Sequence, residues 1–226
     1  MSLPYVFINA AMSADGKIAS SERRQFRLSG RLDFARVDEL RSKSDAIIVG
    51  IETVLSDDPS LTVKSSQLRE MRQREGIPEN PARIVIDSRA RTPPDADLFK
   101  KGEGERIIIT TRRAGKEKLA ILKQQAAIII AGNDRVDLHK ALRELKHRGY
   151  NTIMVEGGAA LNWSLIHDGL VDEIYTFISN QIIGGATSPT LVDGSGYAAS
   201  DETTRLTLIS AESLDSGVLI KWHIAK

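Results

Sequence analysis

The chain has 226 residues, 41% of them apolar, which is enough for one large α/β domain or two small ones. Its 31 lysines and arginines almost balance 30 acidic residues, so no net charge favours a nucleic acid. The absence of cysteine excludes disulfides, thiolate catalysis and cysteine-containing zinc sites, and it favours a cytoplasmic protein. With no basic leader region and no apolar stretch near the roughly 20 residues of a spanning helix, we expect one domain over residues 1–226 and no membrane or metal partner.

Short runs rich in isoleucine and valine predict strands, and helical patterns lie between them. These runs are Tyr5–Ala11, Ala46–Gly50, Arg83–Asp87, Arg106–Thr111, Ala127–Ala131, Thr152–Glu156 and Glu173–Ser179. Several are continuously apolar, which is typical of strands that helices cover on both faces. The sequence therefore predicts an α/β fold with a mostly parallel central sheet and helices on both faces.

Two helices and one loop are predicted between the strands. Ser29 is the expected N-cap of a helix through about Ser42, with Leu32, Ala35, Val37 and Leu40 on one side. A second helix is expected over Asp137–Arg148, ending at Gly149. The segment Lys64–Asn80 is polar, charged and aperiodic, and it predicts a surface loop.

The C-terminal part of the chain changes character. Arg205–Ser210 and Val218–Ile224 alternate apolar and polar residues on either side of Asp215-Ser216-Gly217, which is a turn sequence. We therefore expect an antiparallel hairpin, whose edge could serve a homodimer.

A pair of glycines at a strand end gives the sharpest local signal. Glu156, Gly157 and Gly158 follow an apolar strand and precede a predicted helix, so backbone N–H groups there could bind a phosphate or diphosphate. A tight turn that needs glycine for its geometry alone would have the same sequence. The pattern is not the G-x-G-x-x-G of a Rossmann fold. A second pair in Ile183-Gly184-Gly185-Ala186 also permits a close approach of a cofactor, or forms a simple loop.

Other polar residues follow the strands. Thr53 and Asp57 are four residues apart, so on a helical turn they share a face; a short helix with solvated carboxylates is the alternative. Asn9 to Ile18 leave the first strand through small residues and the turn Asp15-Gly16. Ser88 and Arg89, like Arg112 and Arg113, are candidates for a ribose 2′-phosphate or simply a solvated rim. The four histidines have no metal-ligand spacing, so each is expected on a helix surface or strand.

Five motifs occur in the order found in the riboflavin-biosynthesis reductases. They are Ser13-x-Asp15-Gly16-Lys17, Gly50-x-x-Thr53-Val54-Leu55-x-Asp57-Asp58-Pro59-x-Leu61-Thr62, Arg83-x-Val85-x-Asp87-Ser88, Glu156-Gly157-Gly158 and Gly169-Leu170-Val171-Asp172-Glu173. The chain resembles this family from about residue 5 to about residue 224, with the stand-alone archaeal and fungal members as the best match. The chain departs from the family pattern at two places. Glu52 stands where the family frequently has a small residue, and Arg27 stands where bacterial relatives have an aromatic residue. The resemblance implies a dihydrofolate-reductase-like fold.

The resemblance, taken with these positions, implies the following site residues. Expected cofactor contacts are Ala11, Thr53, Asp57, Ser88, Arg89, Gly157, Gly158, Ala159, Ala160, Leu161, Asn162, Ile183, Gly184, Gly185 and Ala186. Expected substrate contacts are Asn9, Arg41, Leu61, Lys64 and Glu156. Our hypothesis is that Asp57 or Glu156 moves a proton, the alternative being that each only hydrogen-bonds the ribose or the pyrimidine.

The activity that the resemblance implies is a reduction by NADPH, with NADH as a second possibility. The implied substrate is 2,5-diamino-6-ribosylamino-4(3H)-pyrimidinone 5′-phosphate, reduced at the ribosyl C1′ to the ribitylamino product. The lack of a deaminase signature favours reduction before deamination. The alternatives are reduction of the deaminated pyrimidine, a pterin reductase of the same fold, and a nucleotide-binding module without catalysis.

Overall fold

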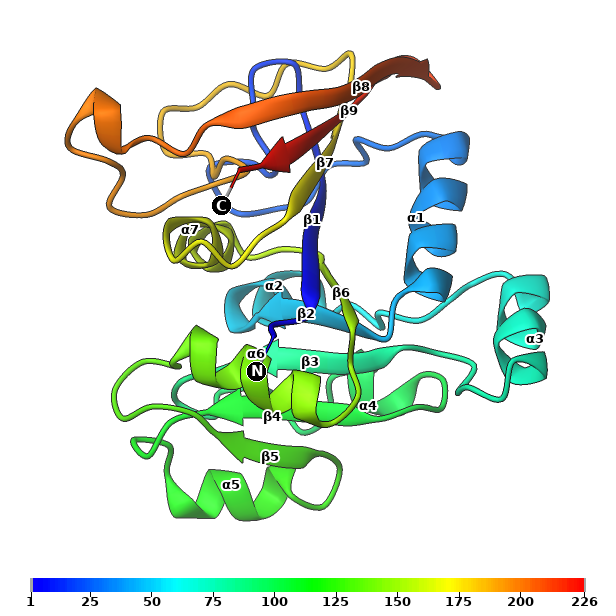
Figure 1. Cartoon of the computed structure of the whole chain (residues 1–226), viewed down its shortest axis with the longest axis vertical. Coiled ribbons are helices and arrows are strands. Elements are labelled where there is room, and N and C mark those ends of the chain that lie inside the picture. The colour runs from blue at the N-terminus through cyan, green and yellow to red at the C-terminus, as the bar shows by residue number, and fades with distance from the viewer. Residues whose placement is uncertain (1, 226) are drawn as a thin grey trace. The chain divides into compact units, whose positions relative to one another are not determined.

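A computed structural model describes residues 2–225, and the chain forms two compact units (Figure 1). Unit 1 contains the N-terminal residues up to Tyr5 together with Asp38–Met154. Unit 2 contains Val6–Val37 and the residues from Val155 onward. Among residues 2–225, no helix is long and apolar enough to cross a bilayer.

Unit 1 is built on a parallel sheet. Its strands are β2 (Ala46–Gly50), β3 (Ala82–Ile86), β4 (Arg106–Thr110), β5 (Ala127–Ile130) and β6 (Thr152–Val155), in the order β5-β4-β3-β2-β6. The pairs β2/β3, β3/β4 and β4/β5 are parallel, and every side chain of β2 is buried. Because successive side chains point to opposite faces, β2 is covered on both. The predicted strands are therefore confirmed, with ends that differ by a residue.

The helices of unit 1 follow these strands. They are α2 (Ile51–Asp57), α3 (Ser66–Arg74), α4 (Asp97–Lys100), α5 (Lys116–Leu122) and α6 (Leu138–His147). The predicted helix over Asp137–Arg148 is confirmed as α6. Its N-cap is Asp137, whose carboxylate accepts the Lys140 N–H at 2.8 Å, and Gly149 follows it with a φ of +94°.

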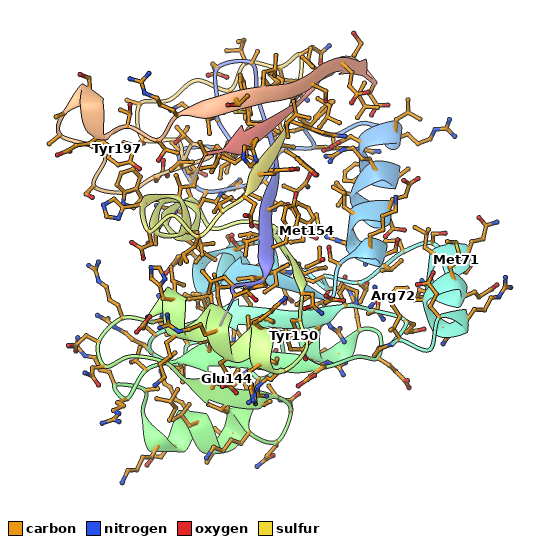
Figure 2. The ribbon with its side chains drawn as sticks, in the orientation of Figure 1. Met71, Arg72, Glu144, Tyr150, Met154 and Tyr197 are labelled. Carbon is orange, nitrogen blue, oxygen red and sulfur yellow. The ribbon has the colours of Figure 1, made fainter. Side chains whose placement is uncertain are left out.

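The expectation that Lys64–Asn80 is only a surface loop is wrong, because α3 lies inside it. Ser65 caps this helix by accepting the Leu68 N–H, and Asp38 accepts the Lys64 and Ser65 N–H groups at 2.6 and 2.7 Å. The buried side chain of α3 is Arg72, which donates to the carbonyls of Ser42, Ser44 and Pro78 (Figure 2). Because a buried arginine anchors this helix, its sequence has no apolar periodicity from which the helix could be predicted.

Unit 2 combines a parallel pair with an antiparallel hairpin. Its strands are β1 (Tyr5–Met12), β7 (Glu173–Ile178), β9 (Gly217–Ile224) and β8 (Leu206–Leu214), in the order β1-β7-β9-β8. β1 and β7 are parallel, whereas β9 runs antiparallel to β7 and to β8. Figure 1 draws β9 in red and β8 in orange. The predicted hairpin is confirmed, although β8 continues to Leu214. Unit 2 also contains α7 (Ala159–His167) and the short η1 (Ser200–Glu202).

The helix expected after Ser29 is α1 (Arg31–Lys43), but its start and its buried side differ from the prediction. Asp215, in the turn of the hairpin, accepts the Leu32 and Asp33 N–H groups at 3.1 and 2.9 Å, so Ser29 is not the cap. Ser29 donates instead to Asp33, which also binds Arg36 at 2.7 Å. Asp33 is therefore buried, whereas Leu32 and Phe34 are 49% and 50% exposed. A paired carboxylate displaces the expected apolar residues from the inner side.

Replacing Asp215 by alanine is expected to lower the free energy of unfolding by about 1 kcal/mol, the usual value for loss of an N-terminal cap. Asp215→Asn is the control, since asparagine keeps an acceptor and tolerates the φ of +48° at this position. Chemical denaturation measures both variants. An Asp215→Ala protein as stable as the wild type would show that this cap does not stabilise α1.

Candidate functional site

The segment after β2 places Thr53 and Asp57 as the sequence predicts. Both lie on α2, four residues apart, and both are partly buried. The next residue, Asp58, has a left-handed conformation with a φ of 42°, and its N–H is bonded to the Val54 carbonyl. Glu52, the departure from the family pattern, forms an ion pair with Arg91 at 2.8 Å. The shared face of a hydroxyl and a carboxylate is therefore present.

Three of the expected substrate contacts gather around Thr62 in unit 1. Arg41 donates to the Thr62 carbonyl at 3.0 Å, and the Lys64 ammonium donates to the hydroxyls of Ser60 and Thr62 at 2.7 and 2.8 Å. Leu61 is buried with a φ of +53°. Desolvation lowers the pKa of Lys64, and the charges of Arg41 and Lys101 lower it further. The carboxylates of Asp38 and Asp97 act on this pKa in the opposite direction, but the net shift is downward, so an anionic ligand beside the cations would be stabilising.

The turn after β3 carries Ser88 and Arg89 and is shaped by the buried Asp87. The Asp87 carboxylate accepts the Thr92 N–H at 2.7 Å, the Thr92 hydroxyl at 2.8 Å and the Arg89 N–H at 3.3 Å. Ser88 accepts the Val136 N–H through its hydroxyl at 3.3 Å. Arg89 is exposed. The sequence indicates Ser88 and Arg89 as candidates but not the role of Asp87. The available signal for that role is an acidic residue directly after an apolar strand.

The glycine pair after β6 forms an open helix N-terminus in unit 2. Glu156 follows the strand, and Gly157 and Gly158 have φ values of +137° and +95°. Gly158 is the N-cap of α7, and no side-chain hydrogen bond caps this end of the helix among the described residues. The first-turn N–H groups can therefore donate hydrogen bonds to an anion such as a diphosphate. The predicted strand, glycine turn and helix are all confirmed.

Near the start of α7, Asn162 is almost fully buried. Its side-chain amide donates to the Leu191 carbonyl at 2.9 Å, while its Oδ1 accepts no hydrogen bond from the described part of the chain. Asn9, an expected substrate contact on β1, has the same property: it is 7% exposed and its Oδ1 has no partner within residues 2–225. Buried polar atoms without partners are uncommon, so both positions suit a ligand that donates hydrogen bonds.

The second glycine pair is held by a carboxylate that sequence reasoning treated only as part of a turn. Asp15 accepts the Ile183 and Gly184 N–H groups at 3.0 and 2.7 Å and the Ser13 hydroxyl at 2.5 Å. These bonds, above all that from Ser13, lower the pKa of Asp15 from 3.8 to about 2. Ala11 lies just before this turn, paired with Phe177 in the register of β1 and β7.

The expected site residues therefore form local groups within each unit. Unit 1 brings together Arg41, Leu61 and Lys64, places Thr53 and Asp57 on one helix face, and sets Ser88 beside Arg89. Unit 2 contains Asn9, Ala11, Glu156 with Gly157–Asn162, and Ile183–Ala186. The histidines lie on α6, α7 and β9, and no cluster of metal-ligating side chains occurs among residues 2–225.

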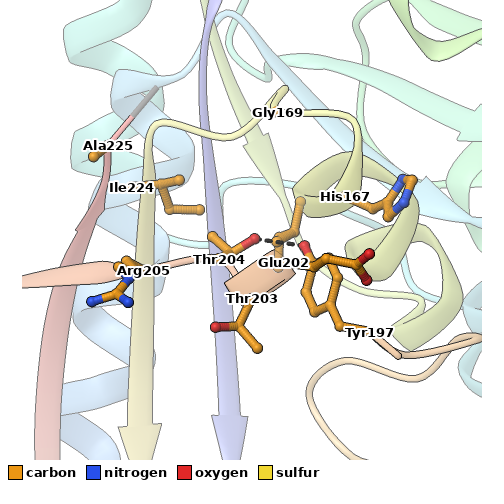
Figure 3. A pocket seen from close by; sticks show the side chains of 10 residues that line it. His167, Gly169, Tyr197, Glu202, Thr203, Thr204, Arg205, Ile224 and Ala225 are labelled. Atoms are coloured by element: carbon orange, nitrogen blue, oxygen red, sulfur yellow. Dashed lines mark hydrogen bonds between the residues drawn. The ribbon is translucent and has the colours of Figure 1, made fainter. Parts of the chain in front are cut away.

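A cavity of about 770 Å³ in unit 2 lies elsewhere, beside the end of α7, η1 and the end of β9 (Figure 3). His167, Tyr197, Glu202 and Arg205 contribute to its wall, and the Tyr197 hydroxyl is 2.6 Å from that of Thr204. None of its lining residues is an expected site residue. The predicted contacts and this cavity are therefore separate features.

Comparison with known structures shows which fold the chain has. The RibD of Acinetobacter baumannii superposes with a TM-score of 0.82 at 22% identity, over 99% of this chain and 58% of that one. This chain thus spans little more than half of the RibD length. The dihydrofolate reductase of Enterococcus faecalis matches with a TM-score of 0.50 at 13% identity, over 98% of this chain and 97% of that one. The fold is therefore dihydrofolate-reductase-like, as the resemblance implied.

Comparison of sequences gives the family. The family model of the RibD C-terminal domain matches residues 4–220. A protein of Archaeoglobus fulgidus, named 2,5-diamino-6-ribosylamino-4(3H)-pyrimidinone 5′-phosphate reductase, is 46% identical over 86% of this chain and 88% of its own. A protein of the same name from Methanothermobacter thermautotrophicus is 41% identical over 98% of both chains. The chain belongs to the RibD C-terminal domain family.

Replacing Gly158 by alanine is expected to raise the Kd of a nicotinamide cofactor at least ten-fold, because a side chain at a φ of +95° strains the turn that exposes the first N–H groups of α7. Gly149→Ala is the matched control, since it has a φ of +94° at the end of α6, outside the expected cofactor contacts. Fluorescence titration with NADPH compares the two. Equal affinities in both variants would remove the Gly158 junction from cofactor binding.

Proposed function

We propose that this protein is an NADPH-dependent reductase of riboflavin biosynthesis that acts on 2,5-diamino-6-ribosylamino-4(3H)-pyrimidinone 5′-phosphate. The observation that carries this proposal is the match over 98% of both chains to a relative named as that reductase. The uncapped N-terminus of α7 behind two glycines supports it, because it suits the diphosphate of a dinucleotide. NADH remains the alternative donor.

In this proposal the C1′–ring-oxygen bond of the ribosylamine breaks and gives an open-chain imine whose former ring oxygen becomes a hydroxyl. The cofactor, when bound, would supply the hydride to C1′, and one proton on the imine nitrogen completes the ribitylamino product. The protein's contribution is to bind and orient. The proposed cofactor contacts are Ala11, Thr53, Asp57, Ser88, Arg89, Gly157–Asn162 and Ile183–Ala186. Holding the reacting atoms together lowers the barrier by converting a bimolecular step into an effectively unimolecular one.

The substrate's phosphate is assigned to the cationic group around Thr62. Arg41 and Lys64 are already oriented by the Thr62 carbonyl and hydroxyl, and the pKa of Lys64 is lowered first by desolvation and then by its cationic neighbours. A doubly charged phosphate relieves that repulsion, so binding is favoured at this place. Asn9, Leu61 and Glu156 complete the proposed substrate contacts.

Asp57 or Glu156 is proposed to move the proton at the ring oxygen or the imine nitrogen of the substrate. Each residue is partly buried, Asp57 at the end of α2 and Glu156 at the end of β6. A carboxylate in such a place can either transfer a proton or hydrogen-bond the ribose. An amide at either position that leaves the turnover number unchanged removes that residue from proton transfer.

The assembly and location are further parts of the proposal. β8 is the last strand of its sheet order, and it exposes Leu206, Leu208 and Ile209. An exposed, partly apolar edge strand invites pairing with a second chain, which supports a homodimer. We further propose that residues 1–226 act as one domain and that the enzyme is cytoplasmic, as the lack of cysteine suggests.

Oxidation of NADPH at 340 nm tests the function directly. We expect turnover with the diamino substrate and much slower or no turnover with the deaminated pyrimidine or with dihydrofolate, each tested at the same concentration. The physical reason is that a site matched to one ring's donors and acceptors leaves buried groups unpaired when another ring binds.

Each other result selects a different function. Turnover only with the deaminated pyrimidine would reverse the proposed order of the two steps, and turnover with dihydrofolate would indicate a pterin reductase. NADPH binding without oxidation by any of the three would favour a nucleotide-binding module.

A further inference from the structure

The segment 180–190 carries a proposed cofactor loop but contains no helix or strand. Its two ends are tied by hydrogen bonds to the turn that follows β1. Ala14 donates its N–H to the Gln181 carbonyl at 2.8 Å, and Ile18 donates to the Pro189 carbonyl at 3.0 Å. The Lys17 ammonium donates to the Ser188 carbonyl at 3.1 Å. The turn after β1 therefore acts as the support for this segment.

Between those ends, one side chain supports Ile183 and Gly184. The Asp15 carboxylate receives the Ile183 N–H on Oδ1 and the Gly184 N–H on Oδ2, at 3.0 and 2.7 Å. Its own orientation is set by Ser13, a fully buried residue whose hydroxyl donates to Asp15 and accepts the Lys17 N–H at 2.9 Å. Both carboxylate oxygens are thus committed to the loop, although Asp15 itself is exposed.

Gly184 and Gly185 make such a tie necessary. Their φ values are +71° and +84°. Glycine adopts positive φ about as readily as negative φ, so the residue type alone does not fix this conformation. A glycine pair without an outside partner samples many conformations, and ordering it on ligand binding costs affinity. An oriented carboxylate removes that cost in advance.

We propose that Asp15 is a positioning residue for the cofactor: it fixes the backbone of Ile183 and Gly184, so that the loop Ile183–Ala186 is already ordered when NADPH binds. This inference rests on the proposed function, in which the loop Ile183–Ala186 contacts NADPH. Asp15 touches neither cofactor nor substrate in this account and acts through the two N–H groups that it accepts.

Asp15→Asn is the main test, because asparagine has the same size but only one acceptor oxygen. It cannot accept both the Ile183 and Gly184 N–H groups, so the loop loses one of its ties. We expect the Kd and KM of NADPH to rise about ten-fold, as for the loss of one hydrogen bond to a charged group, with kcat changed less than about three-fold. Ser13→Ala, which removes the hydroxyl that orients Asp15, should act in the same direction.

Glu22→Gln is the matched control. Glu22 is an exposed carboxylate of the same unit that pairs with Arg24 at 3.1 Å and is outside the proposed site. It should leave the Kd of NADPH unchanged. Thermal unfolding of all three variants checks that they remain folded.

Hydrogen exchange on the full chain without cofactor gives a second, activity-independent readout. In Asp15→Asn the Ile183 and Gly184 amides should exchange faster than in the wild type and in Glu22→Gln. Unchanged exchange at these amides would overturn the proposal, and so would faster exchange with an unchanged Kd of NADPH. If the wild type does not bind NADPH, the proposed function fails and the cofactor role of Asp15 with it, whereas the exchange result then still decides whether Asp15 holds the loop.

Discussion

The hydrogen bond from a backbone N–H to an aspartate carboxylate is the interaction on which the rest of this structure depends. Loops leaving a sheet have backbone N–H groups that no strand partner satisfies, and leaving such groups buried without an acceptor is costly. Aspartates supply the acceptors throughout both units. Among them are Asp15, Asp38, Asp45, Asp87, Asp172 and Asp215. The segments that carry the proposed chemistry are thus held by side chains that do not themselves perform it.

This arrangement separates stability from function. The apolar strands β2, β3 and β4 are buried nearly throughout and fix the sheet of unit 1, while Asp87 shapes the turn that presents Ser88 and Arg89. In unit 2 the same division occurs between β1 with β7 and the turn containing Asp15. Conformational freedom is left to the glycines Gly157 and Gly158, and Gly158, the N-cap of α7, makes no side-chain cap. A site made of backbone N–H groups needs side chains such as Asp15 and Asp87 to hold its loops, because a loop without outside hydrogen bonds does not keep its N–H groups in one orientation.

The sequence predicted most of the elements because apolar periodicity reports burial. It failed where burial is achieved by charged groups: α3 is anchored by Arg72, and the inner side of α1 is formed by Asp33 paired with Arg36. The turn residues were found as motifs, but the contact of Asp15 with Ile183 joins positions far apart in the chain, which no local pattern reveals. Residue roles in the proposed site came from the family resemblance, and local geometry supports the grouping of Arg41 with Lys64.

The proposed function takes the segments after β2, β3 and β6 and the loop Ile183–Ala186 as contacts of a nicotinamide cofactor. Hydrogen exchange of the intact protein with and without saturating NADPH tests it most directly. Exchange within residues 50–57, 86–89, 157–162 and 183–186 is expected to be slower when NADPH is bound. If fluorescence shows NADPH bound while exchange in these four segments is unchanged, the cofactor lies elsewhere and the proposed contacts are wrong.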